Sequence, residues 1–484
     1  MKLFTSDQIR QADLYTIAHE PVAPLALMER AALVLSEWVM RHYRANIPIF
    51  FVVGKGDNGG DGLAMARLLS GVGYRCRVWM ALGREELSKA CHTNLKALPV
   101  AVEQVNTLDV PPNAVVIDAL FGSGLRGTLR AKAASVVEAI NALPNRIIAI
   151  DLPSGLACDF NECGKTIVHA QTTLCIQFPK LGELLPDYGD CCGKLEILPI
   201  GLHPCYLEQT PTTYFYTDEA EILSRVTPRQ TFAHKNTYGH ALVIGGSQGM
   251  IGAALLAAEG ALRSGCGLVT LHIPASERMA ASMRCPSALL SIDNEDAFSE
   301  LPRQLERYAA IGIGCGLGQE AKTLKALKQL LAVAKCPMAL DADALKLLAQ
   351  NKSAQHLIPP GSILTPHVGE LRQLIGNWEN EEQKITMIRD LAKQLRSVIV
   401  NKGAHTMVCM PDGRCWFNAT GNAGMAKGGS GDVLTGLLTG LLARGYSSED
   451  AALIGVYQHG VAGDKAAKQL GEESMHSADL IRFL

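Results

Sequence analysis

The chain has 484 residues, of which 48% are hydrophobic and 19% charged, and its formal net charge at pH 7 is −2. This composition is typical of a globular protein with more than one domain, and the near-neutral charge argues against nucleic-acid and membrane partners. Asp7 interrupts the N-terminus before an apolar signal-peptide core can form, so we expect a cytoplasmic protein.

The fourteen cysteines are scattered and show neither CxxC spacing nor a Cys/His ligand pattern. Zinc sites and the disulfide frameworks of small secreted proteins show such patterns. We therefore expect free thiols, mostly buried, in a reducing compartment.

Apolar residues at helical spacing predict helix from Ser6 to about Tyr43, with Ser6 as the candidate N-cap. Short runs rich in β-branched residues then alternate with helical stretches. This alternation predicts a parallel sheet with helices on both faces, as in a Rossmann-like α/β/α sandwich. The expected strands lie within IPIFFVVG (47–54), YRCRVWMAL (74–82), NAVVIDALFG (113–122), RIIAIDLPSG (146–155), TTLCIQFP (172–179) and KLEILPI (194–200).

Residues 201–235 are polar, contain three prolines and lack a sustained period, so we place a domain boundary near residue 215. The two predicted domains are 1–215 and 216–484. In the second domain the alternation restarts, with a hairpin and two closing helices, at about 430–443 and 449–470. Its expected strands lie within 240–247, 267–274, 309–318, 336–343, 362–367 and 397–403, and the hairpin within 407–418.

The most specific motif of the second domain is TGNAGMAKGGSGDVLTG, residues 420–436. Its glycines directly precede a helix expected to begin near Val433, where backbone N–H groups form an anion hole for a transferring phosphoryl group. Asp432 beside that hole is poorly suited to hold phosphate and well suited to take a proton from an attacking hydroxyl. The alternative is that Asp432 only caps the helix.

Three further segments accompany this motif. NKGAHT (401–406) follows a buried-looking strand, LTPHVGEL (364–371) contains His367, and a glycine turn opens the small-residue stretch 245–267. Each has a structural alternative: an exposed lysine after a strand, a capping histidine, or tight helix packing.

Together and in this order, these segments resemble the ribokinase-like superfamily and, more closely, the ADP/ATP-dependent NAD(P)H-hydrate dehydratases. The resemblance covers residues 225–484 through HKNTYGHALVIGGS, GCGLG, DADAL, LTPHVGEL, KGAHT, GNAGM and GGSGDVLTG. It implies a ribokinase-like fold, ADP or ATP as phosphoryl donor, and Mg²⁺ at the phosphates. The implied contacts to the hydrated dinucleotide are Ala253, Gly316, His367 and Asp432. Those to the adenine nucleotide are Lys402, Gly403, Ala404, His405, Thr406 and Gly431.

Two positions depart from that family's pattern. Ala423 stands where a proline is usual, and Lys427 stands where a small hydroxyl residue is usual. Lys427 adds a charge close to the expected phosphates, so both departures are expected to alter nucleotide affinity. Neither removes a proposed catalytic group, and Asp432 keeps the largest catalytic role.

In the first domain, three motifs follow predicted strands: GKGDNGGDG (54–62), DALFGSGLRGT (118–128) and DLPSG (151–155). Ligands of open α/β sheets bind at that edge. The first loop carries Asp57 and Asp61, where a phosphate would meet like charge, so we assign the phosphates to GSGLRG with Arg126 instead. The alternatives are a flexible surface loop at GSGLRG and carboxylates that only cap loops.

These motifs, with MERAA (28–32) and FPK (178–180), resemble the NAD(P)H-hydrate epimerase family over residues 1–210. The resemblance implies K⁺ at Asn58, Asp118 and Ser154. The implied substrate contacts are Asp57, Asn58, Gly59, Gly60, Asp61, Gly122, Ser123, Gly124, Leu125, Arg126, Gly127, Thr128 and Asp151. Asp57 stands where that family usually has asparagine. Asp151 is the candidate catalytic acid/base, and Lys180 is a second candidate.

The leading hypothesis is a homo-oligomeric bifunctional enzyme that epimerises hydrated NAD(P)H and dehydrates its S form. One alternative is a ribokinase-like vitamin kinase with a regulatory nucleotide-binding N-terminal domain. A third is an enzyme whose N-terminal domain only binds or scaffolds.

Overall fold

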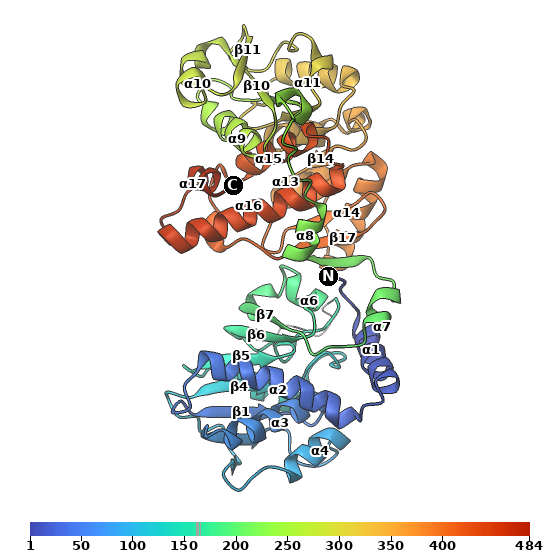
Figure 1. Cartoon of the computed structure of the whole chain (residues 1–484), viewed down its shortest axis with the longest axis vertical. Coiled ribbons are helices and arrows are strands. Elements are labelled where there is room, and N and C mark those ends of the chain that lie inside the picture. The colour runs from blue at the N-terminus through green and yellow to red at the C-terminus, as the bar shows by residue number, and fades with distance from the viewer. Residues whose placement is uncertain (161–163, 165) are drawn as a thin grey trace. The chain divides into compact units, whose positions relative to one another are not determined.

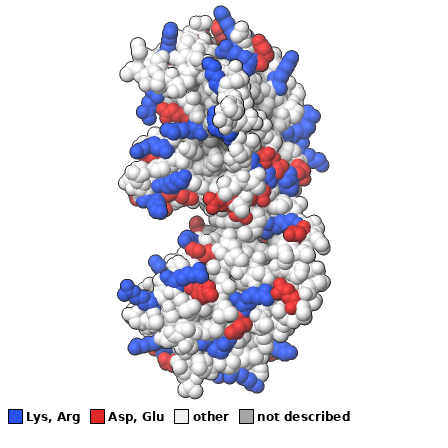
Figure 2. Space-filling model, viewed as in Figure 1, with Lys and Arg blue, Asp and Glu red and all other residues white. Residues whose placement is uncertain are grey.

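The computed structural model describes residues 1–160, 164 and 166–484. The described chain divides into two compact units, Lys2–Tyr214 and Phe215–Leu484, and Met1 belongs to the second (Figure 1). Each unit has its own parallel sheet and its own buried cores. Acidic and basic side chains are interspersed over the visible face of each unit, in keeping with the small net charge (Figure 2).

The first unit has a seven-stranded, wholly parallel sheet in the order β3-β2-β1-β4-β5-β6-β7. Its strands are β1 (Ile49–Val53), β2 (Cys76–Met80), β3 (Glu103–Val105), β4 (Val115–Ala119), β5 (Arg146–Ile150), β6 (Thr172–Ile176) and β7 (Lys194–Leu198). Six of them confirm the predicted strands. The seventh, β3, was not predicted because its three residues form no apolar run and are largely exposed.

Helices cover both faces of this sheet (Figure 1). They are α1 (Ser6–His19), α2 (Pro24–His42), α3 (Asp57–Gly71), α4 (Lys89–Lys96), α5 (Ala131–Asn141), α6 (Leu181–Leu184) and α7 (Pro204–Gln209). One buried cluster joins α2 and α3 to one face, and another joins α5 to the opposite face. The sandwich architecture is therefore as predicted.

The predicted N-terminal helix is in fact two helices, and its predicted cap was wrong. Pro24 opens α2, because proline lacks the N–H that a continuing helix needs. The N-cap of α1 is Thr5 and not Ser6: the Thr5 hydroxyl accepts from the Gln8 N–H, and the Gln8 side chain accepts from the Thr5 N–H.

The segment predicted as an irregular boundary, 201–235, contains regular structure. It holds α7, β8 (Tyr214–Thr217) and α8 (Glu219–Arg225). Tyr216 N–H donates to the Met1 carbonyl at 2.8 Å, and the Met1 amino group donates to the Tyr216 carbonyl at 2.9 Å. A strand of four residues is too short to show a period in the sequence.

The second unit has a ten-stranded sheet in the order β11-β10-β9-β12-β13-β14-β15-β16-β17-β8. In this order the strands from β11 to β15 pair in parallel. Strand β16 pairs antiparallel with both β15 and β17, and the β16–β17 pair confirms the predicted hairpin. The remaining bounds are β9 (His240–Ile244), β10 (Leu268–Pro274), β11 (Leu289–Asp293), β12 (Ala310–Ile313), β13 (Met338–Leu340), β14 (Ile363–Leu364), β15 (Val398–Asn401), β16 (Met407–Cys409) and β17 (Cys415–Asn418).

The helices of the second unit include the two predicted closing helices and one more, α17. They are α9 (Ile251–Arg263), α10 (Arg278–Arg284), α11 (Ala321–Val333), α12 (Ala342–Gln350), α13 (Val368–Ile375), α14 (Glu381–Leu395), α15 (Ser430–Ala443), α16 (Ser448–Leu470) and α17 (Ser477–Phe483). Within the part of the chain that the structure describes, no helix is long and apolar enough to cross a membrane.

Glycines bring α9 and α15 into backbone contact. A Cβ added at Gly436 would lie 1.8 Å from the Ala257 carbonyl oxygen, and one at Gly260 would lie 2.4 Å from the Val433 carbonyl oxygen. Neither contact leaves space for a side chain, and both involve backbone that cannot move without shifting a helix. This close crossing fixes the position of the first turn of α15.

We predict that Gly436→Ala destabilises the second unit by about 1–3 kcal/mol or more, because the added methyl overpacks a backbone contact. Gly252→Ala is the matched control: it lies in α9 with no atom within 4 Å of the added Cβ, and alanine favours helix. Calorimetric unfolding of the full chain should show one transition lowered by the first change and not by the second. Equal midpoints for the two variants would contradict this packing.

Candidate active sites

The first site begins where β1 runs into α3. A Cβ at Gly54 would lie 1.9 Å from the Leu120 carbonyl oxygen, so only glycine fits where β1 leaves the sheet. Helix α3 begins at Asp57, which places Asp57 and Asn58 in its first turn. The motif GKGDNGGDG therefore has the predicted strand–turn–helix geometry.

The three predicted motifs of the first unit meet around Gly122. A Cβ at this position would lie 2.9 Å from Asp151 Oδ2 and 3.1 Å from Asn58 Cγ, so the absence of a side chain lets the other two approach. Both polar atoms of the Asn58 side chain are buried, and neither has a hydrogen-bond partner. Buried amides are normally paired, so this one is expected to meet an ion or a ligand.

Asp151 and Lys180 form a buried ion pair between Oδ1 and Nζ. Asp151 has a left-handed backbone (φ 66°), and its Oδ2 accepts from the Ser123 N–H at 2.9 Å. Lys180 is 1% exposed and also donates to the Ile176 carbonyl at 3.1 Å. Burial alone would lower the pKa of Lys180, but attraction from Asp151 and Glu183 outweighs it and raises that pKa. The ammonium therefore stays charged beside the candidate acid/base.

Two more carboxyl groups, Asp61 and Asp13, have pKa values that the charge of Asp151 helps to raise. Burial, then repulsion from Asp151, raises the pKa of Asp61 well above its usual range and that of Asp13 to about 7. Asp61 belongs to the predicted contacts. The sequence analysis missed Asp13, because one acidic residue on the amphipathic helix α1 looks like an ordinary surface residue, and no motif links it to residues over a hundred positions away.

Asp118 lies fully buried at the end of β4. Its carboxylate accepts from the Ser154 N–H at 2.8 Å, the Ser154 hydroxyl at 2.6 Å and the Leu120 N–H at 3.2 Å. Burial raises its pKa to about 6 in spite of these bonds. The predicted pair Asp118 and Ser154 is therefore brought together.

The GSGLRG segment contains Arg126, the predicted phosphate contact. The Arg126 side chain is 64% exposed and pairs with Asp7 at 2.6 Å. A Cβ at Gly124 or Gly127 would meet open space. Arg126 therefore has an acidic partner in this structure, and its phosphate contact stays a prediction.

The second site is built around the first turn of α15. This helix begins at Ser430, not near Val433, and its N-cap is Gly429 with φ 94°. Gly431 and Asp432 therefore lie inside the first turn, and Asp432 does not act as the N-cap. The N–H groups of a first helical turn lack intrahelical acceptors, so they form the expected anion hole.

Asp341 ties three elements of this site together. It directly follows β13, is 1% exposed, accepts from Lys402 Nζ at 2.7 Å and from the Thr435 hydroxyl at 2.8 Å. A Cβ at Gly431 would lie 3.2 Å from Lys402 Nζ and 3.3 Å from Asp341 Oδ2. The sequence analysis quoted DADAL but gave Asp341 no role. A carboxylate directly after a buried strand was the available signal.

Lys402 and His367 occupy neighbouring strand ends. The Lys402 ammonium lies 3.9 Å from Glu370 Oε2, and Glu370 accepts from the His367 N–H at 3.0 Å. His367 is the N-cap of α13, its Nδ1 accepting from the Gly369 N–H at 2.9 Å, while its side chain stays 57% exposed. The capping alternative is thus correct, and capping fixes an exposed ring at the rim of the site.

Asp432 has the electrostatics of a general base. Burial raises its pKa to about 6; the Cys315 thiol lowers it, and the Asp341 charge raises it. Near neutral pH such a carboxyl is mostly ionised yet basic enough to take a proton. Burial raises the pKa of Cys315 well above its usual range, so that thiol remains protonated and can donate to Asp432.

The remaining predicted contacts flank these groups. Gly316 has φ 58°, and a Cβ there would lie 2.7 Å from the Met250 carbonyl oxygen and 3.3 Å from Ala253 Cβ, so the two predicted substrate contacts are neighbours. In the 402–406 turn, the Thr406 hydroxyl donates to the Gly403 carbonyl at 2.9 Å. Burial lowers the pKa of His405.

The two departures from the family pattern are also placed. Ala423 begins a short 3₁₀ turn, Ala423–Met425, which Asn422 caps by accepting from the Gly424 N–H. The Lys427 ammonium donates to the carbonyls of Glu473 at 2.7 Å and Met475 at 2.5 Å. Its charge is thus held by the 472–475 loop, which was not expected.

Comparisons with known proteins agree over the whole chain. A family model described as NAD(P)H-hydrate dehydratase matches residues 241–484, and one described as YjeF-related protein N-terminus matches residues 24–182. The bifunctional NAD(P)H-hydrate repair enzyme of Moorella thermoacetica is 34% identical over 100% of this chain and 96% of its own length. That of Coxiella burnetii is 32% identical over 100% and 98%. The chain belongs to this family.

Solved structures match the second unit of this family member. A ribokinase-like superfamily protein from Enterococcus faecalis is 28% identical, covers 56% of this chain and 94% of its own, and has a TM-score of 0.51. The ADP/ATP-dependent NAD(P)H-hydrate dehydratase from Bacillus subtilis, crystallised with ATP and Mg²⁺, is 33% identical over 56% and 95%, with a TM-score of 0.48. The predicted ribokinase-like fold is confirmed.

The residues assigned to K⁺ in this repair-enzyme family member suit a monovalent cation. Asn58 offers a buried oxygen that lacks a protein partner. Asp118 offers a buried carboxylate whose hydrogen bonds do not offset its burial. Oxygen donors are what hard cations prefer. A cation at Asn58, Asp118 and Ser154 would place positive charge beside the Asp118 carboxylate and satisfy the amide oxygen of Asn58.

The second site is where Mg²⁺ is expected, together with the nucleotide phosphates. Across residues 1–160, 164 and 166–484, no group of three or more His, Cys, Asp or Glu side chains is placed to hold a metal ion. Magnesium commonly binds through substrate phosphates and water with few protein ligands.

All thirteen cysteines that the structure describes are free, as expected; Cys163 lies outside the described residues.

We predict that K⁺ raises the melting temperature of the first unit more at pH 7.5 than at pH 5. The folded pKa of Asp118 is about 6, above the usual 3.8, so the folded state binds more protons between these values. Stability is therefore lost as pH rises through this window, and a cation beside the carboxylate offsets that loss. Thermal unfolding in matched KCl and tetramethylammonium chloride measures the effect.

Asp118→Asn should remove both the pH dependence and most of the K⁺ effect. A K⁺ shift of equal size at both pH values, or one that survives in this variant, would contradict the assignment.

Proposed function

We propose that this protein repairs hydrated NADH and NADPH: the first unit interconverts the R and S hydrates, and the second dehydrates the S form with ADP or ATP. The observation that carries the proposal is the match to bifunctional repair enzymes along the entire chain. Two acid groups support it: Asp151, which is buried, and Asp432, which is partly buried. They lie at the candidate sites of the first and second units. The substrates are small molecules, and we expect a cytoplasmic homo-oligomer.

Dehydration begins with proton removal at Asp432. The hydrated ring bears a hydroxyl beside its nitrogen, and the Asp432 carboxylate accepts that hydroxyl's proton as its oxygen attacks the terminal phosphorus of ADP or ATP. AMP or ADP leaves, and a phosphate ester forms. The nitrogen lone pair then expels phosphate, and loss of a proton from the adjacent carbon restores NADH or NADPH.

Binding groups around Asp432 stabilise this transfer. First-turn N–H groups of α15, including that of Gly431, face the moving phosphoryl, and the Lys402 ammonium lies at the same turn. Mg²⁺ carried by the nucleotide supplies further charge stabilisation. Lys402, Gly403, Ala404, His405 and Thr406 hold the adenine nucleotide, and Ala253, Gly316 and His367 hold the hydrate.

Epimerisation is assigned to Asp151 and its partner Lys180. Asp151 carries the hydroxyl proton of the hydrate to the ring nitrogen as the bond between that nitrogen and the hydrated carbon opens to an aldehyde, and the reverse steps close the ring on the other face of the aldehyde. The Lys180 ammonium keeps the Asp151 carboxylate in place. Asn58, Gly122 and the first turn of α3 position the nicotinamide end. K⁺ at Asn58, Asp118 and Ser154 would fix the three loops that carry these groups.

We predict that purified protein with ADP and Mg²⁺ converts S-NADH hydrate to NADH, seen as the return of the nicotinamide absorbance that NADH has and the hydrate lacks. Asp432→Asn should lower kcat by about 10²–10⁴-fold, because it removes the general base. The wild-type kcat/KM should rise with pH as Asp432 ionises around pH 6. Free phosphate and NADH support the proposal, and a stable phosphate ester would favour the vitamin-kinase alternative.

We predict that Asp151→Asn abolishes exchange between the R and S hydrates and leaves dehydration of pure S hydrate unchanged. Chiral chromatography of the hydrates over time, without nucleotide, measures the exchange. Asp432→Asn is the matched control, since it should retain full exchange. Epimerisation at the wild-type rate in Asp151→Asn would remove Asp151 from the chemistry and favour a binding role for the first unit.

A further inference from the structure

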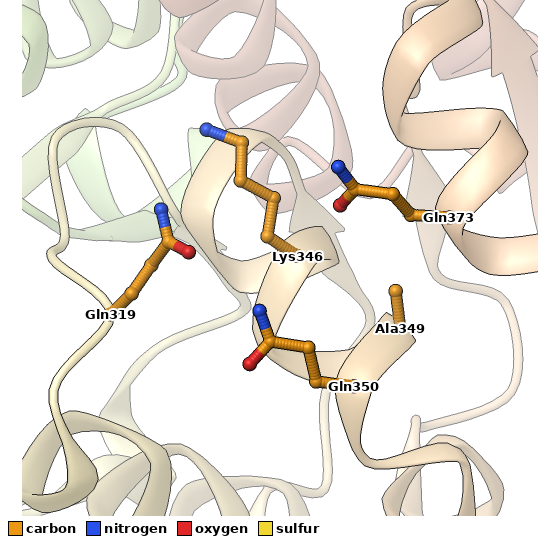
Figure 3. Close-up of a pocket in the computed structure, with 5 residues that line it drawn as sticks. All are labelled: Gln319, Lys346, Ala349, Gln350 and Gln373. Carbon is orange, nitrogen blue, oxygen red and sulfur yellow. The ribbon is translucent and has the colours of Figure 1, made fainter.

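A polar hollow of about 310 Å³ lies on the outer side of α12 in the second unit. The residues that line it are Gln319, Lys346, Ala349, Gln350 and Gln373 (Figure 3). The amides of Gln319 and Gln373 reach toward Lys346 from opposite sides of the helix. A volume of this size accommodates one nucleoside phosphate and falls at the lower end of the range for small-molecule sites.

Asp343 organises one wall of this hollow. Its Oδ2 accepts from the Gly318 N–H at 3.0 Å, and its Oδ1 accepts from Gln319 Nε2 at 2.9 Å and from Lys346 Nζ at 3.2 Å. One carboxylate therefore sets the loop after β12, the Gln319 amide and the lysine relative to one another. The Lys346 ammonium has three protons, of which this contact uses one.

Two of the proposed hydrate contacts, Gly316 and His367, lie in or directly before segments that line the hollow. Gly316 lies in the loop that ends at Gln319. Helix α12 begins directly after Asp341, and Lys346 lies at the end of the first turn of this helix. His367 is the N-cap of α13, which carries Gln373. The hollow thus shares the loop after β12 and helix α13 with two of the proposed hydrate contacts.

The lining points to an adenosine phosphate. Carboxamides both donate and accept hydrogen bonds, so they match the edge of adenine and the ribose hydroxyls. Lys346 is the single charged residue that lines the hollow, and an ammonium recognises phosphate as a point charge. A dinucleotide whose nicotinamide end lies at Asp432 must place its adenosine at a distance, beyond its pyrophosphate.

We propose that this hollow binds the adenosine-phosphate end of the hydrated dinucleotide, with Lys346 at the ribose 2′-phosphate that distinguishes NADPH from NADH. The proposal rests on the proposed dehydratase function. It assigns the adenosine to the hydrate and not to ADP or ATP, because the nucleotide is placed at Lys402–Thr406. Lys346 is thereby a specificity-determining residue.

The test compares Lys346→Ala with the wild-type full chain on S-NADPH hydrate and S-NADH hydrate. We expect the KM for NADPH hydrate to rise about tenfold, with kcat unchanged and the KM for NADH hydrate within about threefold. Gln373→Leu should raise both KM values, because adenine is common to the two. Lys325→Ala, an exposed lysine on the neighbouring helix α11, is the control and should change neither.

Binding of 2′,5′-ADP, measured by calorimetry without turnover, keeps the test independent of activity. Lys346→Ala should weaken it by the same factor as the KM for NADPH hydrate. Unchanged KM and unchanged 2′,5′-ADP binding would overturn the proposal, as would a raised KM for ADP alone. Wild-type protein that binds 2′,5′-ADP through Lys346 but dehydrates neither hydrate would sink the proposed function and leave the subsite standing.

Discussion

Each candidate site depends on a carboxylate–lysine pair in which the carboxylate is buried and lies at the carboxyl end of a parallel strand. In the first unit the pair is Asp151 and Lys180; in the second it is Asp341 and Lys402. The carboxylate follows one strand and the lysine follows another, so each pair joins segments far apart in the chain. Removing one partner of such a pair typically costs about 3–5 kcal/mol, because a buried charge is left uncompensated. The pairs therefore hold strand ends in register with the ligand-binding loops.

The fold explains why these charges are buried at all. In a parallel sheet covered on both faces, the strand ends are the place where backbone turns outward and polar groups can be satisfied. Glycines then let the neighbouring segments close around each pair: Gly122 lies against Asp151 and Asn58, and Gly431 lies against Lys402 and Asp341. A side chain at Gly122 would occupy the space next to Asn58 and Asp151. A side chain at Gly431 would push the first turn of α15 away from Lys402 and Asp341. The small residue and the buried pair are thus parts of one arrangement.

Sequence reasoning recovered the strands that carry long apolar runs and the loops that follow them, because both signals are local. It missed β3 and β8, which are too short to show a period, and β11, an only partly buried edge strand without a long apolar run. It placed the cap of α1 one residue late. It also missed Asp13, for which no local pattern separates a site carboxylate from a surface one, and Asp341, whose place directly after a buried strand was a signal that went unused. Their roles follow from contacts with residues such as Asp151 and Lys402, which only the folded chain brings near. The phosphate role of Arg126 remains a prediction, since the structure pairs it with Asp7.

Burial is the main cause of the raised pKa of Asp432, and the Asp341–Lys402 pair contributes to it. A lysine bound directly to Asp432 would hold that carboxylate in its charged form and make it a weak base. Asp341 instead takes the Lys402 ammonium at 2.7 Å, and its own charge repels that of Asp432. Burial and this repulsion outweigh the remaining attraction from Lys402, which leaves the pKa of Asp432 at about 6. The lysine can then face the phosphates while the neighbouring carboxylate accepts a proton. Two carboxylates beside one lysine thus take different roles, because only one of them holds the ammonium.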